Sequence, residues 1–332
     1  MKKIIIYVFI LFLLTGCSKN NKEVIMNKFI NKVNNSDSYY MKADLELRNN
    51  DEVYNYFVEV SYEKKAKYKV SLTNKSNNST QIIVKNNDGV YILTPSLNRS
   101  FKFQSDWPYN NSQIYLLNAL VNDIKNDKDL SIKKADNEYV IKTIVNYPNN
   151  KELVSQKIFL NEKGNLSKVK VYDTNNIPSL ILTVNKIDFS PSFNKKHFDL
   201  NYIMEKSAMD VKEDTKITSN LEDTIYPLLL PTGTTLASEE KIKTTNGERI
   251  LMTFEGEKPF LLVEETVSKE SDFTVIPTNG VPFQLMDVLG IKTDNSLSWI
   301  SNGIEYYLVS DVLNSSELID IAQSIYVLPT SK

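Results

Sequence analysis

The chain has 332 residues, of which 39 are Lys or Arg and 41 are Asp or Glu, so its formal net charge at pH 7 is −2. A balance this close to neutral argues against a nucleic-acid-binding protein and against a basic surface for anionic lipid. Eighteen tyrosines and fourteen phenylalanines against nine glycines favour strands over flexible or repetitive structure.

The first residues have the form of a secretory signal. Lys2 and Lys3 precede an apolar run over residues 4–14, which is shorter than the roughly 20 apolar residues of a membrane-spanning helix. The run ends in small residues before Cys17, the only cysteine of the chain. This arrangement resembles a bacterial lipobox, which implies that the Cys17 thiol receives a diacylglycerol and becomes the first mature residue. We therefore expect a signal peptide over 1–16 and a lipidated tether over 17–22.

Two or three acyl chains anchor a protein stably, so we expect the mature protein on the extracytoplasmic face of the cell membrane. With Cys17 used for lipid, no disulfide can form, and the domains must be stable through packing alone. The remaining residues, about 315, are enough for two ordinary domains. No second apolar run of spanning length follows.

The first expected element after the tether is a helix over 23–33, whose apolar residues have helical spacing. After Ser38 the period changes to that of short, aromatic and β-branched strands separated by Asn-rich turns. These expected strands cover 53–62, 67–73, 81–85, 90–93 and 99–103. At hairpin spacing they predict an antiparallel meander.

One helix interrupts this series. Asn111 and Ser112 can cap a helix over 113–125, whose apolar residues lie on one face. Strands resume at 130–133, 139–145, 152–160, 166–172 and 179–187. Ten strands in one meander with two helices predict a mainly β fold with a strongly curved sheet, which either closes as a barrel or has its open face covered by the helices.

A second unit follows a polar, weakly patterned stretch over 205–224, which we interpret as a linker. Its expected strands cover 248–254, 260–267, 281–285, 296–301 and 304–310. The last two, separated by Asn302-Gly303, are the clearest hairpin of the chain. A final helix is expected over 318–325. The predicted domains are thus 23–204 and a small α+β domain over 225–332.

Several segments resemble lipoproteins of Gram-positive spore-formers that carry a domain similar to the lipoprotein carrier LolA. The resemblance covers roughly residues 24–204 and rests on the segment from Asp106 to Leu117 and on His197-Phe198-Asp199-Leu200. From Tyr226 on, the chain is similar to the small C-terminal domain of unassigned function that often follows in those proteins. Sporulation-associated lipoproteins are the nearer likeness, and germination lipoproteins the more distant one.

The resemblance implies a half-open LolA-like β-barrel whose concave apolar face is covered by helices. In the carriers this cavity holds the acyl chains of a lipoprotein in transit. Two features depart from that pattern. Carriers are soluble shuttles, whereas Cys17 would tether this chain, and carriers lack the second domain, which suggests a regulatory or partner-binding task.

Residues suited to catalysis are scarce. The only histidine, His197, is more simply structural or solvated than catalytic. Neither a Cys/His cluster nor a nucleophile elbow is present in the sequence, so we expect no metal, no cofactor and no enzyme activity. Glu264 and Glu265 would point to opposite faces of a strand and cannot form a two-carboxylate site by themselves.

Four residues are candidates for a cavity or a partner surface: Trp107, Tyr115, Leu116 and Leu120. Trp107 precedes the expected 113–125 helix, where an indole could line or plug a cavity mouth, although a core tryptophan that locks the helix onto the sheet is the simpler interpretation. For the other three, periodicity cannot distinguish a ligand cavity from a dry core.

Two functions remain open from the sequence. The first is a non-enzymatic, membrane-anchored envelope protein that binds an apolar ligand or a protein partner, with sporulation or germination as the setting and a cell-wall hydrolase as one class of partner. The second is lipid or lipoprotein handling, in which the cavity accepts acyl chains. A cavity packed with side chains would favour the first, and an empty one of several hundred Å³ the second.

Overall fold

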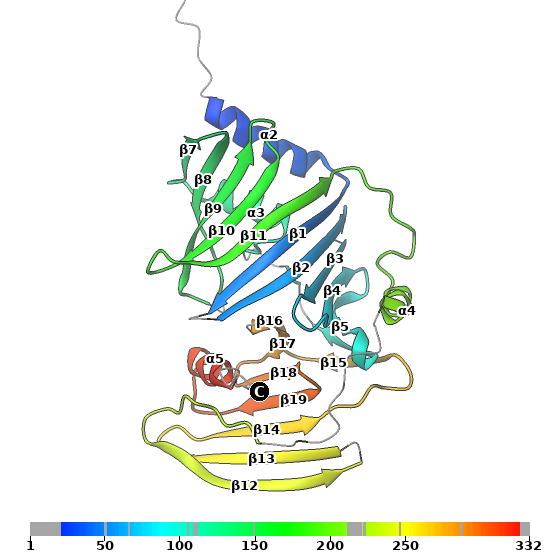
Figure 1. The fold of residues 1–332 in the computed structure, drawn as a ribbon, viewed down its shortest axis with the longest axis vertical. Helices are drawn as coiled ribbons and strands as arrows, with labels where there is room; N and C mark the ends of the chain where they lie inside the picture. Colours follow the sequence, from blue (N-terminus) through cyan, green and yellow to red (C-terminus); the bar gives the residue numbers. More distant parts are fainter. Residues whose placement is uncertain are drawn as a thin grey trace, which may run out of the picture.

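The computed structural model describes residues 21–49, 52–65, 67–104, 106–108, 112–148, 150–210, 221, 224–245, 247–285 and 288–325. The predicted signal peptide, Cys17 and most of the predicted tether lie outside these residues. The described strands form two sheets, one of twelve and one of seven strands. Figure 1 shows the two sheets one above the other along the long axis of the molecule.

The larger sheet has the order β15-β6-β5-β4-β3-β2-β1-β11-β10-β9-β8-β7. Its strands are β1 (Ser38–Asn49), β2 (Glu52–Glu63), β3 (Lys67–Asn74), β4 (Thr80–Asn86), β5 (Gly89–Thr94), β6 (Arg99–Phe103), β7 (Ser131–Ala135), β8 (Glu138–Ile144), β9 (Leu153–Asn161), β10 (Leu166–Asp173), β11 (Pro178–Asp188) and β15 (Thr274–Thr278). Apart from β15, neighbouring strands pair antiparallel.

Side-chain alternation explains why this sheet has one apolar face. Along β3, every second residue is buried, including Tyr68, Val70 and Leu72, which is the period of a strand with one face in a core. β1 has the same pattern from Tyr39 to Leu47. This strand was absent from the prediction, although its charged outward positions from Lys42 to Arg48 alternate with apolar residues as in a half-buried strand.

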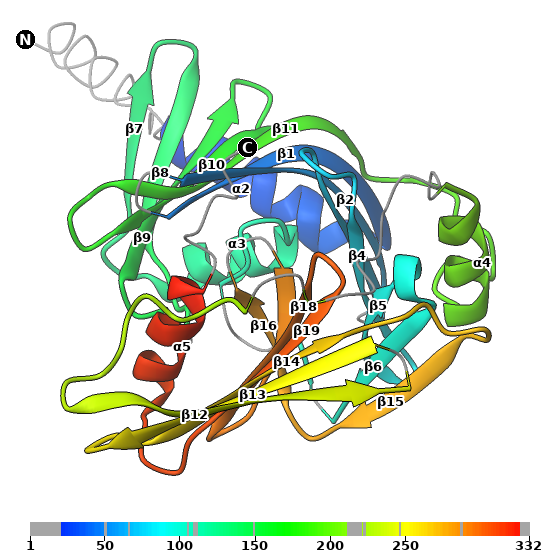
Figure 2. The same cartoon turned by 60° about the horizontal axis from the view of Figure 1, so that its bottom comes forward.

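Two helices occupy the concave side of this sheet, inside the arc that Figure 2 shows. The first, α2 (Asn21–Asn35), buries Ile25, Phe29 and Val33, the face that the helical spacing predicted. The second, α3 (Leu117–Asn126), buries Leu117, Leu120, Val121 and Ile124 among others. The expectation of a curved, half-open sheet covered by helices is therefore confirmed.

The predicted start of α3 is wrong by four residues. The helix begins at Leu117, with Leu116 as a cap residue that makes no side-chain capping bond. Ser112 cannot cap it, because its hydroxyl instead donates to Asp123 Oδ1 (2.9 Å) and accepts the Asn146 backbone N–H (2.7 Å).

A helix absent from the prediction covers the convex face. α4 (Leu200–Asp210) includes the first six residues of the predicted linker. Asp199 begins it by accepting the Tyr202 backbone N–H. Ile203 and Met204 are buried against residues of β4 and β5, such as Ile82. Because few apolar residues of this helix are buried, its residues 205–210 were interpreted as part of a polar linker.

The smaller sheet has the order β12-β13-β14-β19-β18-β17-β16. Its strands are β12 (Thr234–Thr244), β13 (Gly247–Gly256), β14 (Phe260–Thr266), β16 (Val281–Leu285), β17 (Val288–Lys292), β18 (Ser296–Ser301) and β19 (Ile304–Val309). The final helix, α5 (Ser315–Ser324), covers one face through Leu318, Ile321 and Ala322. Of these strands, β12 and β17 were not predicted. β12 has nine consecutive exposed residues and so lacks strand alternation.

The C-terminal part of the chain contributes an edge strand to the larger sheet. β15, also unpredicted, comes from the C-terminal part of the chain and pairs parallel with β6 of the larger sheet. Arg99 on β6 makes ion pairs with Glu270 (2.8 Å) and with Glu305 of β19 (3.3 Å). Local sequence carries no signal for a pairing between segments about 170 residues apart.

β17 completes the core of the first sheet. Leu289 is buried within that core, and Ile291 packs against it. Gln81 of β4 fixes this contact with two hydrogen bonds, because its amide donates to the Leu289 carbonyl (3.0 Å) and its oxygen accepts the Leu289 N–H (2.6 Å). The concave face is thus covered by α2, by α3 and by a strand of the second sheet.

Candidate functional site

The four candidate residues lie in one hydrophobic core on the concave side. Leu116 and Leu120 have no exposed surface, Trp107 is 4% exposed and Tyr115 is 8% exposed. The structure therefore brings the four residues into one cluster. In this conformation their side chains offer no surface to a protein partner, and a role in ligand binding stays a prediction.

Trp107 ends a row of aromatic rings across the sheet. Its ring meets Tyr68 edge-on at 5.9 Å, Tyr68 lies 5.0 Å from Tyr62, and Tyr62 stacks on Tyr39 at 4.9 Å. Burial raises the pKa of the Tyr39 and Tyr68 hydroxyls well above the usual range. Such rings hold a core together through large buried areas and edge or stacked contacts.

A half-buried carboxylate near the end of α3, Asp123, was not predicted. Asp123 accepts hydrogen bonds from Ser112 Oγ (2.9 Å) and Gln156 Nε2 (2.7 Å). Burial raises the pKa of Asp123 to about 6, while these two bonds act in the opposite direction. The three residues lie far apart in the sequence, so no local pattern could have identified them. Their contacts tie α3 to the sheet.

His197 has a structural environment. Its Nε2 lies 2.8 Å from Ser61 Oγ, and its ring stacks on Phe193 at 4.4 Å. Burial, followed by the nearby Lys69 ammonium, lowers the pKa of His197 to about 4. The ring is neutral at pH 7 and joins the segment before α4 to β2, which supports the structural interpretation.

The pair Glu264 and Glu265 lies on opposite faces of β14, as predicted. Glu265 forms an ion pair with Arg249 (2.6 Å). Glu264 has no exposed surface, and among the residues that the structure describes its Oε2 accepts one hydrogen bond, from the Ile225 backbone N–H at 3.3 Å. Burial raises the pKa of Glu264 to about 7. The Glu239 carboxylate of β12 raises this pKa further, so a second carboxylate lies close enough to interact with Glu264.

Within the described ranges, no group of three or more His, Cys, Asp or Glu side chains could hold a metal ion. None of the described helices has both the length and the apolar character needed to span a membrane.

An open groove of about 630 Å³ separates the two units at one end of the larger sheet. Its first wall comes from the ends of β1, β9, β10 and β11, with Arg48, Glu152 and Asp173. Its second wall is α5, with Ile319 and Asp320. No local sequence pattern indicates this groove, because its walls lie more than 130 residues apart in the chain.

Comparisons with known proteins gave a family match for the N-terminal residues and similar solved structures for the folded part. Residues 1–18 match the family model described as "Prokaryotic membrane lipoprotein lipid attachment site", so the N-terminus carries a lipoprotein attachment site. Among solved structures, the Pseudomonas aeruginosa MucA/MucB complex is similar with 10% identity, a TM-score of 0.33, and coverage of 91% of this chain and 96% of that chain. The LolA superfamily protein NE2245 from Nitrosomonas europaea is similar with 11% identity, a TM-score of 0.32, and coverage of 54% and 98%.

Sequence similarity to a curated protein is much stronger. The sporulation protein YdcC of Bacillus subtilis (strain 168) is 37% identical over 314 residues, which are 94% of this chain and 93% of that protein. At this identity and coverage, the chain belongs to the family of the sporulation protein YdcC.

Proposed function

We propose that this lipoprotein is a non-enzymatic docking protein on the extracytoplasmic face of the membrane, where it binds an envelope protein during sporulation. Cys17 carries the lipid. The folded part consists of a LolA-like domain over 23–204 and a C-terminal α+β domain over 225–332. A cell-wall hydrolase is the class of partner that the resemblance suggests.

The filled concave face is the observation that carries this proposal. Leu116 and Leu120, at the centre of the face, are fully buried, and Leu289 of β17 joins the same core. Protein interiors are packed as densely as organic crystals. An acyl chain could enter only if α3 or β17 moved away, which would expose their apolar residues to water at a cost of about 25 cal/mol per Å².

Polar surface accessible to a partner exists elsewhere, in the groove beside α5. A groove between two packed units is a common position for a binding site. The alternative function, acyl-chain binding, would place the ligand among Trp107, Tyr115, Leu116 and Leu120.

Native mass spectrometry of the mature lipoprotein, released from detergent, separates the two functions. We expect the mass of the chain with its covalent lipid and nothing more. Lipid extraction of the same sample should return no acyl ligand beyond the anchor. A stoichiometric, non-covalent acyl ligand would contradict the docking proposal and favour the alternative.

A further inference from the structure

The groove beside α5 joins two separate hydrophobic cores. Leu153, 7% exposed, belongs to the core of the larger sheet, and Ile319, 9% exposed, belongs to the core of the smaller one. The volume of about 630 Å³ lies within the range of sites that hold a small ligand or a few side chains. An occupant would therefore contact both units at once, mostly through polar side chains and through the small exposed parts of Leu153 and Ile319.

Two carboxylates face this groove without a cationic partner among the described residues. Glu152 lies in the turn immediately before β9, and Asp320 lies on α5. Partial burial and then the charge of Glu152 raise the pKa of Asp320, so the two groups interact across the groove. Two like charges that face each other favour a cation between them.

The other charged groups of the walls are largely satisfied. Arg48 pairs with the carboxylate of Glu46, and Asp173 accepts the backbone N–H groups of Asn175 and Ile177. Lys151 is exposed in the turn before β9 and has no carboxylate partner among the described residues. The walls therefore keep two unpaired carboxylates against one unpaired ammonium.

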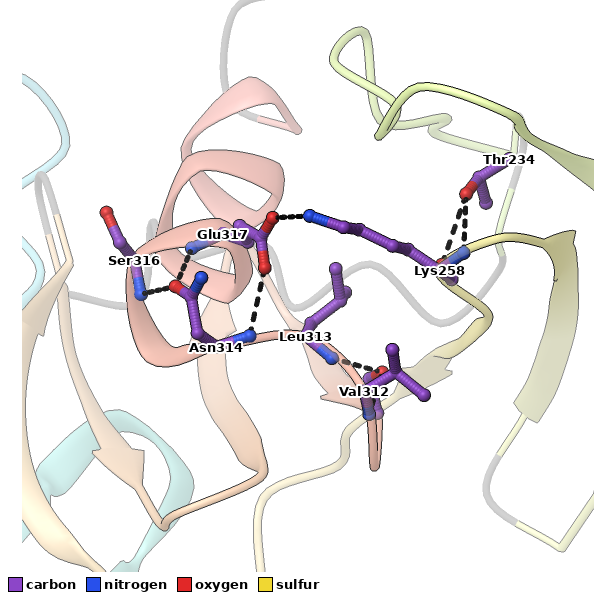
Figure 3. A network of polar contacts seen from close by, with 8 residues as sticks. Thr234, Lys258, Val312, Leu313, Asn314, Ser316 and Glu317 are labelled. Carbon is purple, nitrogen blue, oxygen red and sulfur yellow. Dashed lines mark hydrogen bonds and ion pairs between the residues drawn. The ribbon is translucent and has the colours of Figure 1, made fainter.

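The N-terminus of α5 does not offer an anion site. Asn314 Oδ1 already accepts the backbone N–H groups of Ser316 (2.9 Å) and Glu317 (3.1 Å). The Glu317 carboxylate in turn accepts the Asn314 N–H and pairs with Lys258, as Figure 3 shows. Because these N–H groups are used in a capping box, an anion in the groove would meet carboxylates rather than free donors.

We propose that this groove is the docking site for a segment of the protein partner that presents lysine or arginine beside an apolar residue. The basic side chain lies between Glu152 and Asp320, and the apolar residue lies on Leu153 and Ile319. This inference rests on the proposed docking function and names the surface and the chemistry that it uses.

The charge requirement is tested with the mature lipoprotein in phosphatidylcholine nanodiscs. The probe is a fluorescent heptapeptide in which lysine alternates with leucine, and its counterpart has glutamate in place of lysine. We expect the lysine peptide alone to bind. The double variant Glu152→Gln/Asp320→Asn should weaken it about fivefold to tenfold, because exposed ion pairs contribute up to about 1 kcal/mol each.

The matched control is Glu205→Gln/Glu240→Gln, which removes two exposed carboxylates on α4 and β12. These carboxylates do not line the groove, so we expect unchanged affinity. Equal binding of the two peptides, or an equal loss in both double variants, would overturn the proposal.

Photo-crosslinking in sporulating cells distinguishes failure of the groove from failure of the docking function. A photoreactive residue is placed at Gln323, which lines the groove, and separately at Glu205 on α4. We expect a protein adduct at Gln323 that the Glu152→Gln/Asp320→Asn change reduces. An adduct only at Glu205 overturns the groove and leaves the docking function standing, whereas a scan of exposed positions without any adduct overturns both.

Discussion

Glu264 gives the sharpest quantitative test of the structure. Its side chain has no exposed surface, and its Oε1 has no hydrogen-bond partner among the described residues. Burial raises the pKa of Glu264 from 4.5 to about 7 in the folded protein. The native state therefore binds this proton more tightly than the unfolded chain does. The free energy of unfolding must fall as the pH rises from 4.5 to 7 and level off above that range.

The magnitude follows from the shift. A difference of about 2.5 pKa units corresponds to about 3 kcal/mol at 1.36 kcal/mol per unit. Between pH 5 and pH 8, ionisation of this one group should remove about 2.5 kcal/mol of stability. Glu264→Gln abolishes the titration. Burying the Gln amide changes the free energy of unfolding by the same amount at every pH. The difference in unfolding free energy between variant and wild type therefore changes with pH only because Glu264 ionises in the wild type.

Urea unfolding of both proteins at pH 5 and pH 8 measures this change. We expect the variant to gain about 2.5 kcal/mol relative to wild type on going from pH 5 to pH 8. Glu265→Gln is the matched control, because that side chain lies on the other face of β14 in an ion pair with Arg249. Its stability difference should change by less than about 1 kcal/mol. If the difference in unfolding free energy between Glu264→Gln and wild type is the same at pH 5 and pH 8, the raised pKa of Glu264 is refuted.

Three further outcomes are expected. Leu120→Ala should lower the free energy of unfolding by about 2 to 5 kcal/mol, whereas Asn122→Ala on the exposed face of α3 should change it by less than about 0.5 kcal/mol; equal effects in thermal or urea unfolding would contradict the packed concave face. Gln81→Ala should speed hydrogen exchange at the Leu289 amide, its direct partner, and unchanged exchange there would contradict the contact between the units. Cys17→Ala should release the protein from the membrane fraction, and retention would refute the anchor.

The elements predicted from the sequence are those whose apolar residues recur with the period of a helix or a strand. The apolar residues of α2 and the alternation of β3 are local patterns, so both elements were identified from the chain alone. β12 shows the limit of this approach. Nine consecutive exposed residues have no apolar alternation, and the strand exists because β13 offers it a long antiparallel edge.

The candidate site shows the same limit more strongly. Periodicity placed Leu116 and Leu120 on an apolar face but could not tell a cavity from a core. Their core also contains Leu289 of β17, which comes from a segment about 170 residues further along the chain. The groove was also beyond prediction, because Glu152 and Asp320 come together only when α5 packs beside the end of the larger sheet.

The contact between Gln81 and Leu289 connects these observations. A LolA-like sheet with an open concave face is suited to carrying an acyl chain, as the resemblance implies. In this chain, Leu289 is buried in that face, and Gln81 fixes the Leu289 backbone through both of its polar groups. Removing β17 would expose apolar core to water and break both hydrogen bonds of the half-buried Gln81 amide. The proposed function therefore places binding in the groove where the two units meet rather than on the concave face.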